Sequence, residues 1–102
     1  MQDDFLRIYD ACLTSRLLEQ RLLALWHERK TKLIFSALGA ELAPATVACL
    51  LQRDDYLIPR YRGFSAVLGK GVPLEAVAAE MLGKQSGTTH GFGDVSSLRD
   101  PQ

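Results

Sequence analysis

The feature that most constrains the fold is the stretch from residue 3 to residue 30, which contains no glycine or proline. Its apolar side chains recur at steps of three and four residues, the spacing of one face of an α-helix. They are Phe5, Ile8, Tyr9, Cys12, Leu13, Leu17, Leu22, Leu23 and Trp26. The stretch therefore predicts one long helix. Because it is long for a chain of 102 residues, we expect it to pack on something beyond the other residues present.

Three shorter helices are predicted downstream, over residues 41–52, 64–70 and 74–82, where Pro73 and Gly83 bound the last one. Their expected inward side chains are Leu42, Val47, Leu50 and Leu51 in the first, and Leu74, Val77, Ala78, Met81 and Leu82 in the last. Residues 33–35 and 56–59 are predicted as short strands or extended pieces. The fold class expected for this segment is mainly α, with three to four helices and one or two short strands.

Composition narrows the class of protein. An apolar fraction of 47% with 24% charged residues is ordinary for one globular domain or part of one. Twelve basic residues balance twelve acidic ones, which argues against a nucleic acid or a membrane as the main partner. Cys12 and Cys49 lack a CxxC spacing, so we expect reduced, buried thiols and a cytoplasmic location. Residues 83–102 form a Gly/Ser/Thr-rich loop, and a loop of this length predicts an incomplete domain.

The run Arg60-Tyr61-Arg62, followed by Gly63, is the strongest candidate site. Arginine binds phosphate through a planar, permanently charged fork, and a tyrosine hydroxyl adds a directed donor. A helix starting at Phe64 would add free N–H groups. The run predicts an anion site, although two solvated arginines beside a half-buried tyrosine would show the same pattern.

The other polar candidates carry weaker signals. His27 is expected to lie exposed near the end of the long helix, and His90 is expected to be a loop residue rather than a base. Glu41 is interpreted as an acid at a helix N-terminus. The glycines of the final loop, Gly87, Gly91 and Gly93, are compatible with a backbone nest for an anion but match no phosphate-binding motif.

Three segments in order carry a family resemblance: "LLEQRLLALWHERK", "GAELAPATVACLLQRDDYLIPRYRG" and "LGKGVPLEAVAAEMLGKQSGTTHGFG". Over residues 6–101 the chain resembles the N-terminal part of the alpha subunit of thiamine diphosphate-dependent 2-oxo acid dehydrogenases, a family that includes the pyruvate, branched-chain 2-oxo acid and acetoin dehydrogenases. The resemblance implies that residues 1–102 are an N-terminal segment of a parent α/β fold that binds thiamine diphosphate.

The resemblance also implies a function. Tyr61 and Arg62 match the pair that binds the cofactor diphosphate, and no catalytic residue is assigned. The intact oxidoreductase, a heterotetramer, uses thiamine diphosphate with Mg²⁺ whose ligands lie outside this chain. The implied partners are a beta subunit and a lipoyl-bearing acyltransferase component. The 102-residue chain alone is expected to be inactive.

Several positions depart from the family pattern: Phe35 and Ser97 stand where histidines are common, Ala40 stands where glutamine is usual, and Gly63-Phe64-Ser65 replaces a segment that often contains histidine. They leave the identity of the substrate open, whether a 2-oxo acid or acetoin. Two alternatives also stay open. One is a non-catalytic relative that serves as a helical interaction or assembly module, and the other is a stand-alone anion-binding domain that uses Arg60, Tyr61, Arg62 and the loop glycines.

Overall fold

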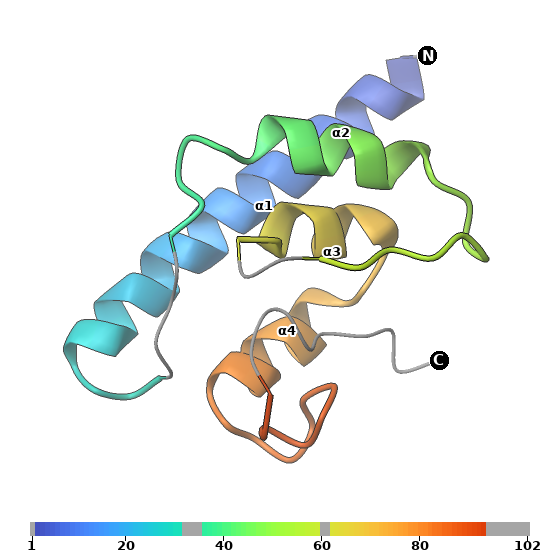
Figure 1. Ribbon diagram of the computed structural model, residues 1–102. Helices are drawn as coiled ribbons and strands as arrows, with labels where there is room; N and C mark the ends of the chain where they lie inside the picture. The colour runs from blue at the N-terminus through green and yellow to red at the C-terminus, as the bar shows by residue number, and fades with distance from the viewer. Residues whose placement is uncertain (1, 32–35, 60–61, 94–102) are drawn as a thin grey trace.

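The computed structural model of the chain describes residues 2–31, 36–59 and 62–93. These residues form four helices, α1 (Gln2–His27), α2 (Leu42–Leu50), α3 (Phe64–Lys70) and α4 (Leu74–Met81) (Figure 1). All four predicted helices are therefore confirmed, with ends that differ from the prediction by a few residues. Gly71, which adopts a left-handed φ of 110°, ends α3, and Pro73 directly precedes α4.

The long helix α1 forms one side of the molecule. At about 1.5 Å per residue it is roughly 39 Å long, close to the longest dimension of the chain, 41 Å. Figure 1 shows α2 and α3 side by side across α1, with α4 beyond α3, and each pair among the first three helices is in contact. One long helix thus serves as the support on which the shorter elements are arranged.

Two groups of buried side chains join the helices. The larger group connects α1 to α3 and α4, and it consists of Leu22, Phe64, Val67, Val72, Val77 and Met81. The smaller one connects α1 to α2 through Ala11, Ala45 and Cys49. Val77 and Met81 are inward as predicted, whereas Leu74 is exposed.

The predicted inward face of α2 is wrong. Leu42, Val47 and Leu50 are exposed, and the buried residues of this helix are Ala45, Ala48 and Cys49. The physical reason is the close approach of α2 and α3. A Cβ placed on Gly69 would lie only 3.1 Å from Cys49 Sγ, so only small side chains fit between the two helices.

The predicted apolar stripe of α1 is only partly buried. Leu22 lies in the core, and Ile8 and Cys12 pack against the smaller group. A second set of apolar side chains on α1 recurs at four-residue intervals and is exposed: Phe5, Tyr9, Leu13 and Leu17. We call this set the outer row of α1. The expectation that α1 packs on a further partner therefore stays a prediction.

The remaining segments contain turns and extended backbone. Residues 56–59 belong to no strand, and the described parts of the chain contain no strand at all. The other predicted strand, residues 33–35, lies outside the described residues. Residues 83–93 contain no helix, as predicted, and follow a series of turns after α4. The parent α/β fold is therefore not visible in this segment.

Candidate functional site

Two buried carboxylates fix the segment 36–41 that connects α1 to α2. The first belongs to Glu19 on α1, whose residue surface is 1% exposed. Its Oε1 atom accepts the N–H of Ala37 at 2.7 Å, and its Oε2 atom accepts the hydroxyl of Ser36 at 3.1 Å. Because buried carboxylates need such donors, the start of this segment is tied to the middle of α1.

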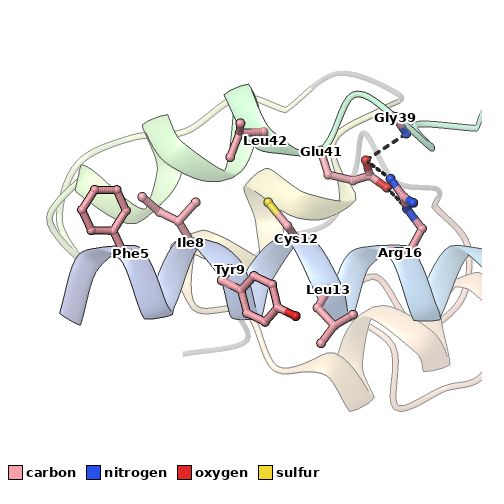
Figure 2. Close-up of a pocket in the computed structure, with 9 residues that line it drawn as sticks. All are labelled: Phe5, Ile8, Tyr9, Cys12, Leu13, Arg16, Gly39, Glu41 and Leu42. Carbon is pink, nitrogen blue, oxygen red and sulfur yellow. Dashed lines mark hydrogen bonds and ion pairs between the residues drawn. The ribbon is translucent and has the colours of Figure 1, made fainter. Parts of the chain in front are cut away.

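The second carboxylate belongs to Glu41, directly before α2. Arg16 donates to it from two nitrogens, Nε to Oε2 at 2.7 Å and Nη2 to Oε1 at 3.0 Å, and the N–H of Gly39 donates to Oε1 at 2.9 Å (Figure 2). The hydrogen bond from Arg16 lowers the pKa of Glu41 in spite of its burial, and the same contact raises the pKa of Arg16. Glu41 is thus more than the helix-terminal acid that the sequence suggested.

Arg62 reaches the same segment from the other side. Its Nε atom donates to the backbone carbonyl oxygen of Ser36 at 2.9 Å, and its side chain is exposed. Two residues further, α3 begins at Phe64, and the buried hydroxyl of Ser65 donates to the backbone carbonyl oxygen of Glu41 at 2.9 Å. Segment 36–41 therefore joins α1, α2 and the start of α3, and Arg62 lies at its edge.

Arg62 is thus placed at a fixed position, while its predicted neighbours are not described. Arg60, Tyr61, Phe35 and Ser97 lie outside the described residues. Sequence reasoning missed the two carboxylates as a connected unit. No signal in the sequence singled out Glu19, because the burial of its face of α1, which also carries Ser15, is known only from the structure.

A shallow groove runs beside this unit, between the first half of α1 and the start of α2 (Figure 2). Its volume is about 500 Å³, and its walls are mainly apolar side chains, among them Ile8, Cys12 and Leu42, with Arg16 and Glu41 at one end. Both cysteines of the chain carry free thiols, as predicted, but only Cys49 is buried, whereas Cys12 is partly exposed. Burial raises the pKa of both thiols.

The glycine-rich loop is organised around a third carboxylate, that of Glu80 on α4. The N–H groups of Thr89, Gly91 and Gly93 all donate to it, at 2.5, 3.2 and 2.7 Å. Of the three glycines considered for an anion nest, Gly91 and Gly93 donate to this carboxylate, whereas the N–H of Gly87 donates to the carbonyl oxygen of Lys84. The anion that the amides bind is a side chain of the same molecule.

His27 is exposed near the end of α1 and His90 lies in the loop, as the sequence predicted. His27 ends α1, where its ring lies 5.4 Å from that of Trp26. His90 is an exposed residue of the loop.

No group of three or more His, Cys, Asp and Glu side chains within the described residues is arranged to hold a metal ion. In the same part of the chain, no helix has the length and apolar character needed to cross a membrane.

Comparison with known proteins gives the family. Residues 9–99 match the family described as the dehydrogenase E1 component. The chain belongs to this family. It is also similar to the alpha subunit of the pyruvate dehydrogenase E1 component of Porphyra purpurea, with 40% identity over 55 residues. The matched stretch covers 54% of this chain but only 16% of that protein. No solved structure matches the chain significantly.

The match confirms the resemblance to the N-terminal part of a 2-oxo acid dehydrogenase alpha subunit. It spans all four helices except the first turns of α1, and it includes segment 36–41, Arg62 and the Glu80 loop. The polar unit described above is therefore part of an E1-type segment rather than an appendage to it.

Proposed function

We propose that this chain is the N-terminal part of the alpha subunit of a thiamine diphosphate-dependent 2-oxo acid dehydrogenase, and that Tyr61 and Arg62 contact the diphosphate of the cofactor. One observation carries the proposal: the family match over residues 9–99 contains an exposed arginine whose guanidinium is oriented by a backbone carbonyl. Thiamine diphosphate supplies the carbanion chemistry when bound, and the protein supplies binding and orientation.

The donor set fits an anion. A guanidinium has five N–H donors in a rigid plane, and the Nε bond to the Ser36 carbonyl fixes the orientation of that plane in Arg62. Ser36 is itself tied to Glu19, which is buried. The orientation of Arg62 thus depends on a short chain of contacts that ends inside the protein, so less side-chain freedom is lost when an anion binds.

The wider assembly is part of the proposal. We propose a beta subunit and a lipoyl-bearing acyltransferase component as partners, magnesium ligands outside this chain, and a cytoplasmic location. The name of the Porphyra relative makes pyruvate the first 2-oxo acid to test. Acetoin and branched-chain 2-oxo acids remain the other substrates to compare.

The test compares Arg62→Ala with Arg21→Ala, a matched control because Arg21 is exposed on α1. Titration calorimetry would measure the affinity for thiamine diphosphate with Mg²⁺ in the protein assembled with its beta subunit. A hydrogen bond to a charged group contributes about 1.5–3 kcal/mol, so we expect Arg62→Ala to weaken binding about tenfold or more. Equal affinity in the two variants would contradict the assignment of Arg62.

A second candidate function, that of a helical assembly module, is favoured by the outer row of α1. Phe5, Tyr9, Leu13 and Leu17 form an exposed apolar stripe on one side of the helix, and such stripes are typical of helix–helix contacts. Sedimentation of the isolated chain distinguishes the two. A stable dimer whose mass does not respond to thiamine diphosphate supports the assembly module.

A further inference from the structure

The carboxylate of Glu80 is entirely buried, with 0% of the residue exposed, and lies at the centre of the glycine-rich loop. Its Oε1 atom accepts the N–H groups of Thr89 and Gly91, and its Oε2 atom accepts the N–H of Gly93 and the hydroxyl of Thr89. Backbone amides that converge on one point bind anions, and here the converging amides belong to the alternate residues 89, 91 and 93. In this loop the converging amides already have their anion.

The charge state of Glu80 follows from these contacts. Burial alone would raise the pKa of a carboxyl group. Here the bonds from Thr89, Gly93 and Gly91 outweigh burial and lower the pKa of Glu80 to about 2. Glu80 is therefore ionised at every pH at which the protein is expected to work, and the loop keeps its anion throughout that range.

The glycines of the loop allow its backbone to lie close to the end of α4. A Cβ on Gly87 would lie 2.6 Å from the Cα of Glu80 and 2.8 Å from its Oε1. A Cβ on Gly91, whose φ is 85°, would lie 2.4 Å from the carbonyl carbon of Gly83. These positions require glycine because the loop folds back onto the end of α4. They are accounted for without an external ligand.

The loop holds His90 in an unusual conformation. Its φ of 56° is rare for a residue with a side chain, and its neighbours Thr89 and Gly91 are both bound to the same oxygen of Glu80. The Nδ1 atom of His90 lies 3.1 Å from the carbonyl oxygen of Gln85. Because a carbonyl oxygen can only accept, Nδ1 carries the proton in this contact, and Nε2 carries the lone pair of the neutral ring.

We propose that Glu80 is the built-in anion of the glycine-rich loop: its carboxylate occupies the place that a phosphate would take, and it positions His90 with one defined tautomer at the surface. Glu80 is a positioning residue, since it acts through the backbone of residues 89–93. This inference does not depend on the proposed cofactor role of Arg62. It excludes the amides of Thr89, Gly91 and Gly93 from any contact with the diphosphate, because these amides already bind Glu80.

The first test uses the unmodified chain and inorganic pyrophosphate, followed by ¹H–¹⁵N NMR. The amide signals of Thr89, Gly91 and Gly93 should stay unshifted as pyrophosphate is added, and the ring nitrogens of His90 should show the Nδ1–H tautomer. A saturable shift of the loop amides, or an Nε2–H tautomer, overturns the proposal. A shift confined to residues around Arg62 bears on the cofactor assignment alone, so the two ideas fail separately.

The second test compares Glu80→Gln with Glu75→Gln, a control on the exposed first turn of the same helix. Glutamine keeps the shape of the side chain but puts an NH₂ group where an accepting oxygen was. Loss of one charge-assisted bond should accelerate hydrogen exchange at Gly91 or Gly93 at least about tenfold. The smallest expected effect is about a tenfold change in the exchange rate. Exchange rates in Glu80→Gln within about twofold of those in the control would therefore refute the role of Glu80.

A third variant allows chemical rescue. Glu80→Ala removes a two-carbon carboxylate fragment, which acetate in solution matches. We expect acetate to restore the slow exchange of the loop amides and the His90 tautomer in a saturable way, with chloride at equal ionic strength as the control. If acetate has no more effect than chloride, the loop amides do not form an anion-binding site and the proposal is wrong. Should the variants not fold, the pyrophosphate titration still decides the matter.

Discussion

Replacing Glu41 by glutamine tests the unit that fixes segment 36–41. In the native protein this carboxylate is 5% exposed and accepts bonds from the Arg16 guanidinium and from the N–H of Gly39. Glutamine has nearly the same size, so the packing around residue 41 is kept. What changes is the charge, and one accepting oxygen becomes an NH₂ group that faces a donor.

The magnitude follows from the contacts. A hydrogen bond to a charged group contributes about 1.5–3 kcal/mol and a neutral one about 1 kcal/mol. The side chain of Arg16 is 46% exposed. Solvent screening therefore reduces the contribution of the Arg16–Glu41 pair to the free energy of unfolding to that of a surface contact. The total loss expected for Glu41→Gln is about 2 kcal/mol of unfolding free energy, or roughly 10 °C in melting temperature for a chain of this size.

The direction of the pKa shift of Glu41 determines how its contribution to stability changes with pH. The pKa of Glu41 is lowered in the folded protein, mainly by the hydrogen bond from Arg16. Its ionised form therefore stabilises the fold fully above the unfolded pKa of about 4.3. This stabilisation is lost as pH falls through the lower folded pKa. The stability difference between the native chain and Glu41→Gln should be largest near neutral pH and should shrink in acid.

Urea unfolding followed by circular dichroism measures the difference at several pH values. The matched control is Glu28→Gln, because Glu28 forms an exposed ion pair with Lys30 at 3.3 Å. We expect the control to change the unfolding free energy by less than about 0.5 kcal/mol. A loss at Glu41 no larger than the control's, or one that is equal at all pH values, would refute the reasoning.

Two further predictions concern packing. Phe64→Ala removes a fully buried ring at the contact of α1, α3 and α4, and thermal unfolding should show a loss of about 3–5 kcal/mol. An intact melting temperature would mean that the core is not as described. Leu50→Ser, at a side chain 62% exposed on α2, should change stability by less than about 0.5 kcal/mol in the isolated chain. A loss of several times that size would restore the sequence-based view that this face of α2 is buried.

The helices could be predicted because their signals are local. The absence of glycine and proline from residues 3–30, and the positions of Gly71, Pro73 and Gly83, bound the elements within a few residues. These signals depend only on neighbours along the chain. For the same reason the loop character of residues 83–93 was accessible from composition alone.

The buried faces and the polar unit could not be predicted in the same way. Leu42, Val47 and Leu50 share one side of a helix as well as Ala45, Ala48 and Cys49 do, and only the spacing between α2 and α3 decides which side is inside. Likewise Ser36 and Arg62 are 26 positions apart, and Arg16 and Glu41 are 25 apart. No local pattern reports a contact over such a separation. Tyr61 stays a prediction from resemblance.

The sequence separations of the three carboxylate contacts have a consequence for the order of folding. Glu80 bonds to residues only 8–13 positions away, and closing a loop of about ten residues takes roughly 10–100 ns. Glu19 bonds to residues 17 and 18 positions away, and Glu41 bonds to Arg16, 25 positions away, across the junction of α1 and α2. We therefore expect the Glu80 loop to close and reopen independently many times before α1 and α2 meet. Segment 36–41, and with it the orientation of Arg62, would be among the last features of the native state to form.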